Sequence, residues 1–183
     1  MSLFDVEEVS LRSGSSQKHY GKFRGTVVNN IDPKQIGRIQ VMVPDVSNVA
    51  ISSWALPCLP WGGIQTGMFC VPLIGAGVWV EFEQGDPDYP IWTGCYWGSA
   101  TETPSAAKLI PPAIPGLTIQ TPTTNMIQIS DVPGPTGGIQ LKTRLGAMIS
   151  ITDVGITISN GLGAMITLTG PTVDINSGAL TVI

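Results

Sequence analysis

The 183-residue sequence predicts an all-β protein with a small N-terminal barrel of about five strands and a C-terminal array of shorter strands. Short runs of alternating apolar and polar residues, bounded by Gly, Pro, Asn and Asp, occur throughout the chain. Residues 145–152 (LGAMISIT) are nearly repeated by residues 162–169 (LGAMITLT). Only 12% of the residues are charged, while 22 glycines and 15 prolines supply many turn formers. These observations favour many short strands over helices.

The N-terminal strands have a two-residue period, which places alternate side chains on opposite faces. In the predicted strand at residues 37–43, the odd-numbered residues from Ile39 to Val43 share an apolar face, and Pro44 ends the strand. In the predicted strand at residues 77–83, the even-numbered residues from Val78 to Phe82 are expected to point inward. The predicted strands are residues 21–29, 37–43, 53–57, 67–72, 77–83 and 90–96.

The chain divides into four segments. We expect an N-terminal arm at residues 1–19, a barrel at 20–99, a proline-rich linker at 100–117 and a strand array at 118–183. Prolines at 104, 111, 112 and 115 disfavour a helix and predict an extended spacer in the linker. The fourth segment has no aromatic residue and only five charges, so it cannot form an ordinary core alone.

The strand array predicts a homotrimer, because thin identical strands around a threefold axis can share a core that one copy cannot enclose. The apolar side chains in it alternate with hydroxyl and amide side chains, and glycines allow tight corners. The predicted trimer core consists of Ile127, Ile129, Ile139, Leu141, Ala147, Ile149, Ile151, Ile156, Ile158, Ala164, Ile166, Leu168, Val173 and Ile175.

Charge and cysteine content narrow the classes of partner. A net charge of −4 argues against a nucleic-acid partner, which requires clustered Lys and Arg. The first residues contain no apolar run resembling a secretion signal, so we expect synthesis in the cytoplasm. Cys58, Cys70 and Cys95 lack CxxC spacing and are expected to be reduced, buried, small apolar side chains.

Residues 20–98 contain linked motifs: "GRIQVMVPD", "SSWALPCLPWGG" and "GVWVEFEQGDPDYPIW". This region resembles the OB-fold domain of phage baseplate spikes and of the valine-glycine repeat spikes of type VI secretion. Several motifs at the expected spacing are more specific than any one alone. The residues that carry the resemblance are Gly37, Arg38, Trp54, Pro60, Trp61, Phe82, Gly85, Asp86, Pro87 and Asp88.

The resemblance implies a five-stranded OB-fold barrel followed by a triple-stranded β-helix in an intertwined homotrimer. It also implies a structural central spike at the tip of the inner tube of a contractile injection machine. In this role the rigid trimer pierces the target envelope and contacts the target membrane transiently. A hub or tube-initiator protein would bind the OB or N-terminal end, and the chain would be incorporated into a phage tail or tail-like particle.

The chain departs from relatives of this family in two respects. The linker leaves no room for the lysozyme domain that some phage spikes carry, so no catalytic residue and no enzyme activity are expected. The sole histidine, His19, lies far from the C-terminus, so an iron-binding His-x-His tip is not expected, nor any cofactor. A tip protein of the proline-alanine-alanine-arginine (PAAR) repeat type is instead expected to dock on Ala179, Leu180, Val182 and Ile183.

Two other functions remain possible from the sequence. OB folds can bind single-stranded nucleic acid by stacking bases on aromatic side chains, and an adhesin can carry a β-solenoid stalk. Without a basic groove, the tryptophans, Phe69 and Phe82 are expected in the barrel core or in trimer contacts. Asp86 and Asp88 are expected to form a plain turn and not a calcium site.

Overall fold

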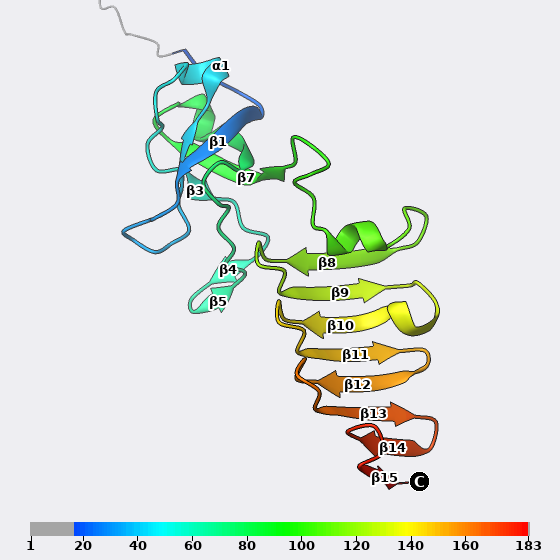
Figure 1. Cartoon of the computed structure of the whole chain (residues 1–183). Helices are drawn as coiled ribbons and strands as arrows, with labels where there is room; N and C mark the ends of the chain where they lie inside the picture. Colours follow the sequence, from blue (N-terminus) through cyan, green and yellow to red (C-terminus); the bar gives the residue numbers. More distant parts are fainter. Residues whose placement is uncertain (1–16, 183) are drawn as a thin grey trace, which may run out of the picture. The chain divides into compact units, whose positions relative to one another are not determined.

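The computed structural model describes residues 17–182, which form two compact units divided after Gly98 (Figure 1). Most of the predicted N-terminal arm at residues 1–19, and Ile183 of the predicted docking surface, lie outside the described residues. Strands dominate both units, so the predicted all-β class is confirmed.

The N-terminal unit contains a five-stranded sheet in the order β2-β1-β6-β7-β3. All neighbours are antiparallel except β3 and β7, which are parallel. A bridge between Ile39 and Ala55 joins the chain at the two edge strands, which brings the sheet close to a barrel. The strands are β1 (Phe23–Asn29), β2 (Gln40–Met42), β3 (Leu56–Pro57), β6 (Gly77–Phe82) and β7 (Pro90–Tyr96).

The alternation read from the sequence places the core of this unit correctly. The odd-numbered residues from Ile39 to Val43 are at most 2% exposed, and the even-numbered residues from Val78 to Phe82 are at most 9% exposed. Trp92 joins this cluster, while Trp61 and Trp97 are exposed. The aromatic side chains are therefore divided between the core and the surface.

The prediction of a strand at residues 67–72 is wrong. Instead, a separate two-stranded hairpin is formed by β4 (Gly62–Gly63) and β5 (Thr66–Gly67). Met68, Phe69 and Cys70 follow it as exposed, irregular chain with no partner strand. Two short helices complete the unit: α1 (Pro44–Ser47) and the 3₁₀ helix η1 (Glu83–Gly85).

The expectation that the cysteines are buried is also wrong. Cys58, Cys70 and Cys95 are free thiols, and all three residues are exposed. Alternation cannot locate them, because two lie in irregular segments beside the sheet and the third lies near the end of β7. The turn after β6 agrees with its prediction, since the backbone N–H of Asp88 donates to Asp86 Oδ1 at 3.1 Å.

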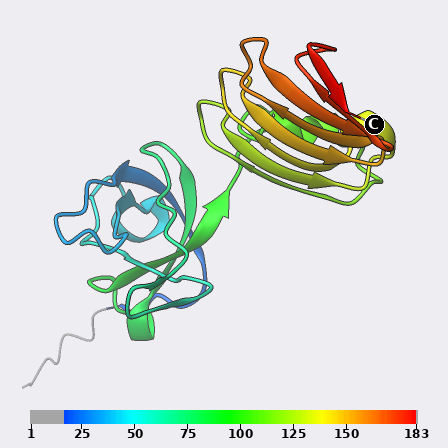
Figure 2. The same cartoon turned by 90° about the horizontal axis from the view of Figure 1, so that it is seen from below.

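The C-terminal unit is one eight-stranded antiparallel sheet in sequential order from β8 to β15 (Figures 1 and 2). Because every strand pairs with its neighbours along the chain, the hydrogen-bond ladder runs within one copy. The strands are β8 (Gly116–Gln120), β9 (Met126–Ser130), β10 (Gly138–Lys142), β11 (Met148–Thr152), β12 (Gly155–Ser159), β13 (Met165–Thr169), β14 (Thr172–Ile175) and β15 (Leu180–Val182).

Part of the segment expected to be an extended spacer differs from that expectation. The 3₁₀ helix η2 (Ala106–Leu109) forms between the prolines and contacts β8. Gln120 Oε1 accepts the Ala106 N–H at 3.0 Å, and Gln128 Nε2 donates to the Ala106 carbonyl at 3.0 Å. The side-chain amides of Gln120 and Gln128 thus satisfy the backbone N–H and C=O of Ala106.

Candidate assembly interface

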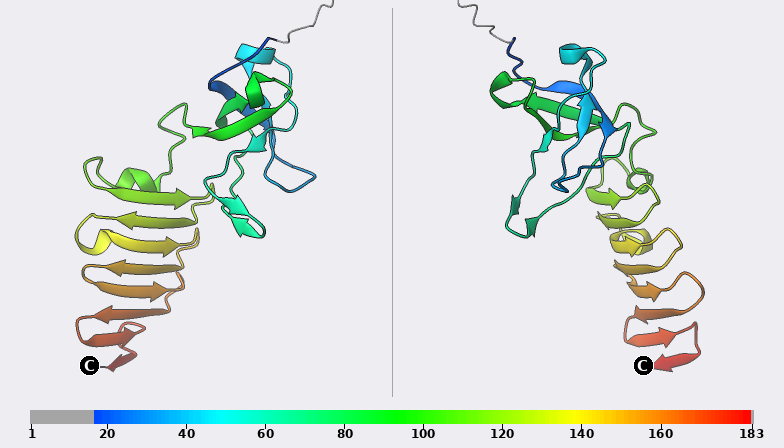
Figure 3. Two further views of the ribbon diagram at one scale, coloured as in Figure 1. Left: turned by 180° about the vertical axis from the view of Figure 1, so that it is seen from behind. Right: turned by 90° about the vertical axis from the view of Figure 1, so that its left-hand side faces the viewer.

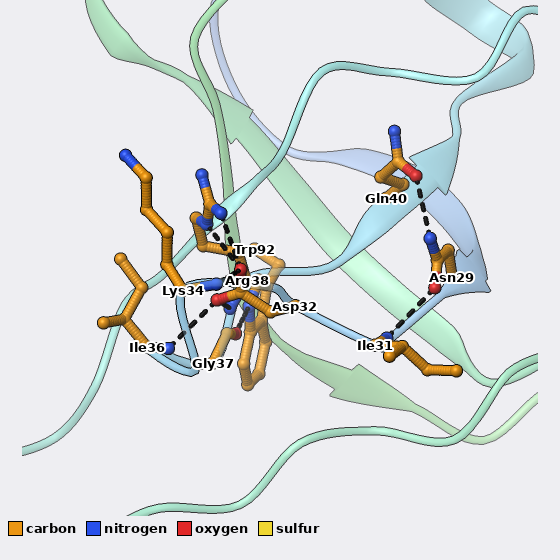
Figure 4. Close-up of polar contacts among 9 residues, drawn as sticks. All are labelled: Asn29, Ile31, Asp32, Lys34, Ile36, Gly37, Arg38, Gln40 and Trp92. Carbon is orange, nitrogen blue, oxygen red and sulfur yellow. Dashed lines mark hydrogen bonds and ion pairs between the residues drawn. The ribbon is translucent and has the colours of Figure 1, made fainter.

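The Gly-Arg motif of the N-terminal unit fixes the loop between β1 and β2 (Figure 4). Gly37 has a φ of 79°, a left-handed conformation that favours glycine, and its carbonyl accepts the Trp92 Nε1–H at 3.1 Å. Arg38 Nη2 donates to Asp32 Oδ1 at 2.6 Å, and its guanidinium lies 5.1 Å from the centre of the Trp54 ring. These contacts give structural roles to three of the motif residues.

Asp32 is the acceptor at the centre of this loop, with its side chain only 4% exposed. Besides the guanidinium of Arg38, it accepts the backbone N–H groups of Lys34, Ile36 and Arg38. The hydrogen bond from Arg38 is the largest cause that holds the pKa of Asp32 well below its usual range, and the backbone donors act in the same direction. The loop is therefore pinned by a buried carboxylate.

Three other basic side chains of the N-terminal unit, those of Lys18, Lys22 and Arg24, contact acids or aromatic rings. Lys18 pairs with Asp86 at 3.4 Å and Lys22 pairs with Glu81 at 2.8 Å. The backbone N–H of Asp88, followed by Lys18, lowers the pKa of Asp86. Arg24 lies over the rings of Trp79 and Tyr96. These cations are engaged by acids and aromatic rings of the same unit.

The C-terminal sheet has one face formed by two columns of aliphatic side chains, which we call the aliphatic face. In each strand pair, the residues of a column lie directly opposite one another, so neither column is interrupted. The first column is Ile119, Ile127, Leu141, Ile149, Ile158, Ile166, Ile175 and Leu180. The second is Leu117, Ile129, Ile139, Ile151, Ile156, Leu168, Val173 and Val182.

The aliphatic face is not covered within the chain. Thirteen of its sixteen side chains are 37–54% exposed. A hollow of about 550 Å³ lies over strands β8 to β12 and is lined in part by Ile119, Leu141 and Ile149. By contrast, Gln128, Ser130 and Ser150 on the opposite face are no more than 7% exposed. The aliphatic face is thus more exposed than parts of the polar face. In a sheet that packs on a core within its own chain, the apolar face is the buried one.

Twelve of the predicted core residues lie in these columns, and the structure adds four residues to the predicted core. Leu117 and Ile119 begin the columns in β8, while Leu180 and Val182 end them in β15. The last pair was predicted as a separate docking surface, yet it continues the aliphatic face. The two alanines predicted in the core, Ala147 and Ala164, lie in loops just before β11 and β13.

The two edges of the sheet have different loops. Residues 121–125, 143–147, 160–164 and 176–179 form what we call the wide-loop edge. Backbone hydrogen bonds from Thr121 to Asn125, from Thr143 to Ala147 and from Asn160 to Ala164 close three of these loops. The other edge carries two-residue turns at 153–154 and 170–171 and a longer excursion at 131–137 that includes η3 (Gly134–Thr136); we call it the tight-turn edge. The two edges are visible in Figure 3.

Other apolar side chains are exposed on the N-terminal unit. They gather around the β4–β5 hairpin, where Ile64 and Phe69 are 97% and 69% exposed and Trp61 is also exposed. Among residues 17–182, no three His, Cys, Asp or Glu side chains come close enough to hold a metal ion. Within the same residues, no helix has the length and apolar content needed to span a bilayer.

Comparison with known proteins agrees with the division into two units. Residues 23–97 match the type VI secretion system and phage-baseplate injector OB domain, and residues 116–181 match the phage baseplate V C-terminal trimerisation domain. The second match covers nearly the whole eight-stranded sheet, including the aliphatic face.

Individual relatives are much longer proteins. The type VI secretion system spike protein VgrG1c of Pseudomonas aeruginosa is 30% identical over 117 residues, which are 62% of this chain and 15% of that protein. The spike protein VgrG3 of Vibrio cholerae is 36% identical over 74 residues, 38% of this chain and 7% of that protein. The actin cross-linking toxin VgrG1 of Vibrio cholerae is 40% identical over 72 residues, which are 37% of this chain and 6% of the toxin.

Both matched domains, their order along the chain and the named spike relatives point to one conclusion. An OB domain precedes a trimerisation domain, and the trimerisation domain presents an uncovered aliphatic face. The chain therefore belongs to the family of phage-baseplate and type VI injector proteins that carry these two domains.

Proposed function

We propose that the protein acts as a rigid homotrimer in which three copies turn their aliphatic faces toward a common axis. The two uninterrupted columns carry this proposal, because a single chain leaves thirteen of their sixteen side chains 37–54% exposed. Covering sixteen such side chains contributes on the order of 15 kcal/mol per chain, before the costs of association. Three identical sheets supply the cover with no other partner.

Solution mass tests the trimer directly. Light scattering on the purified chain should give three times the 19.3 kDa chain mass, unchanged on dilution through the micromolar range. A monomer at these concentrations would sink the proposal.

In the same proposal, the trimer is the central spike at the tip of the inner tube of a contractile injection machine. The OB or N-terminal end binds a hub or tube protein, and the needle meets the target membrane transiently while piercing the envelope. The exposed apolar side chains around Ile64 and Phe69 are available for such contacts. The chain is made in the bacterial cytoplasm and performs no catalytic step. The force that drives the spike comes from contraction of the surrounding machine.

Placement in a particle is tested by cryo-electron microscopy of tail-like particles containing the tagged chain. Density for three tagged copies at the tip end of the inner tube is expected. Labelled particles with the tag at any other place would contradict the spike assignment, even if the chain is trimeric.

A tip protein of the PAAR type is proposed to dock on Ala179, Leu180, Val182 and Ile183. Leu180 and Val182 are each 54% exposed at the last strand, where no further strand covers them within the described chain. The variant Val182→Asp, checked by light scattering to be still trimeric, should lose binding to a purified PAAR-type protein in a pull-down assay. Thr181→Asn, on the opposite face of β15, is the control and should retain binding, because an amide can still donate to Asp174, which lies opposite. Equal binding by both variants would remove this part of the proposal.

A further inference from the structure

The two edges of the C-terminal sheet differ in chemistry as well as in loop length. Leu145 and Leu162 are the central residues of the wide loops at 143–147 and 160–164, and they are 73% and 88% exposed. Val154 stands in a tight turn at the other edge and is 54% exposed. Large apolar side chains at both edges are therefore without cover inside one chain.

The charges at the edges are complementary. Arg144 is the only charged residue in the wide loops at 121–125, 143–147, 160–164 and 176–179. The tight-turn edge carries Asp131 and Asp153 and no cation. Asp153 Oδ2 accepts the Gly134 N–H at 3.1 Å, and neither Asp153 nor Arg144 forms an ion pair within residues 17–182. One edge of the sheet is thus positive and the other negative.

Loops on the two edges alternate in height because the sheet is a simple meander. The loop with Arg144 and Leu145 joins β10 to β11, the turn with Val154 joins β11 to β12, and the loop with Leu162 joins β12 to β13. Strands are spaced about 4.8 Å apart, so Val154 lies about one strand spacing from each leucine along the stack.

Cyclic symmetry places unlike edges together. When identical sheets close around an axis parallel to the stack, the wide-loop edge of each copy meets the tight-turn edge of the next at the same height. The contact is heterologous, and it closes only when the last copy meets the first.

We propose that each corner of the trimer is a lock between these edges, in which Leu145 and Leu162 of one copy pack on both sides of Val154 of the next. Arg144 of the first copy pairs with Asp153 of the second. The leucines supply apolar burial, while the ion pair, which is worth little in free energy at a surface, selects register and orientation. The corner lock rests on the proposed trimer and adds to it the residues that join neighbouring copies.

Engineered cysteines test the lock. Leu162 and Val154 lie at opposite ends of β12, roughly 20 Å apart along an extended strand, whereas a disulfide needs Cα atoms about 4–7 Å apart. A disulfide between these positions must therefore join two chains. The test uses Val154→Cys with Leu162→Cys in a background where Cys58, Cys70 and Cys95 are replaced by Ser.

Oxidation with diamide, a two-electron thiol oxidant, should convert most of this variant to covalent trimers on a denaturing gel. The matched control is Leu145→Cys with Pro171→Cys, which uses the same two edges at heights about three strand spacings apart. The control pair should remain at least tenfold less cross-linked.

Four results would overturn the corner lock. It fails if the native mass is trimeric but the Val154/Leu162 pair does not cross-link, an outcome that leaves the trimer itself intact. It fails if the control pair cross-links equally well, or if covalent products extend beyond three chains. A monomeric native mass would remove the proposed trimer together with its corners.

Charge exchange gives a second test that does not depend on cysteine. Arg144→Asp should weaken the trimer, seen as dissociation at a tenfold higher chain concentration than for the unaltered protein. Adding Asp153→Arg should restore most of this loss, because the pair is reversed and not removed. A double variant weaker than either single variant would contradict the pairing.

Discussion

The two units of the molecule build apolar surfaces with the same alternating pattern but complete them differently. In the N-terminal unit, Ile39, Val41, Val78 and Val80 are essentially unexposed, because the sheet curls until its edges meet at Ile39 and Ala55. In the C-terminal unit, the sheet does not curl onto itself, and its aliphatic columns stay about two-fifths exposed. A strand pattern therefore specifies which face is apolar, while the connections decide whether one chain can bury that face.

This difference shows why the C-terminal unit has so few aromatic and charged residues. In the proposed trimer, the aliphatic face must fit the same face of two other copies, which favours repeated side chains of similar size at each height. Ile, Leu and Val at every column position meet that need. The OB unit, whose core is irregular, uses Phe82 and Trp92 to fill a closed space.

The largest expected effect comes from a charge in the aliphatic face. Ile149→Asp would bring three carboxylates together in an apolar core, which costs several kcal/mol for each unpaired charge. We expect a monomer where the unaltered chain is trimeric, measured by light scattering. Thr157→Asp, on the opposite face of the adjacent β12, is the control and should stay trimeric. A stable Ile149→Asp trimer would show that the aliphatic face is not the interface.

A cavity in the closed core should act on the other unit. Ile39 is fully buried, so Ile39→Ala should destabilise the OB unit by about 2–5 kcal/mol in chemical denaturation. The trimer mass at low denaturant should not change, because Ile39 belongs to the other unit. Loss of the trimer in this variant would show that the two units do not behave as separate cores.

Acid should weaken the OB unit through Asp32. Its folded-state pKa lies below its ordinary value of 3.8, so its stabilising contribution is fully present above about pH 4 and is lost as the pH falls through the folded-state pKa. Asp32→Asn should lower the denaturation midpoint at neutral pH and flatten the decline between about pH 4 and about pH 2. An unchanged acid slope in this variant would exclude Asp32 as its cause, and Asp45→Asn, in the exposed first turn of α1, provides the comparison.

The smallest expected effect concerns η2. Gln120→Ala removes the acceptor of the Ala106 N–H, a loss of about 1 kcal/mol. Hydrogen exchange of the Ala106 amide should accelerate roughly fivefold, since this loss is local. Gln140→Ala, which removes only a 3.5 Å contact to the Thr136 carbonyl, should leave that amide unchanged. Equal exchange in both variants would show that the glutamine contact does not hold η2.

Much of this architecture is predictable because alternation is a local property of the sequence. It identifies the inward residues of β2 and β6 and the aliphatic residues from Ile127 to Ile175. The strand prediction fails at residues 68–72, where an apolar run has no partner strand and Met68, Phe69 and Cys70 remain exposed. Whether a strand forms depends on a neighbour that is distant in sequence, which periodicity does not report.

Other features depended on side-chain contacts between separate segments. In the proline-rich segment, Gln120 and Gln128 hydrogen-bond to Ala106 of η2 and add to the backbone hydrogen bonds of this helix. The residues of β8 and β15 have the right alternation, but their continuity with the columns is shown only by the register of the strand pairs. The opposed charges of Arg144 and Asp153 become informative only once the meander places them on different edges.

The sequential order of the C-terminal sheet also bears on how the protein is made. Each of its strands pairs with the next strand along the chain, while the OB sheet must bring Phe23 to Val80. Contacts between near neighbours in sequence form quickly, so each needle sheet has a low contact order and needs no threading of one chain around another. In the proposed trimer, the slow step would then be the encounter of three folded sheets, and its rate should rise with chain concentration.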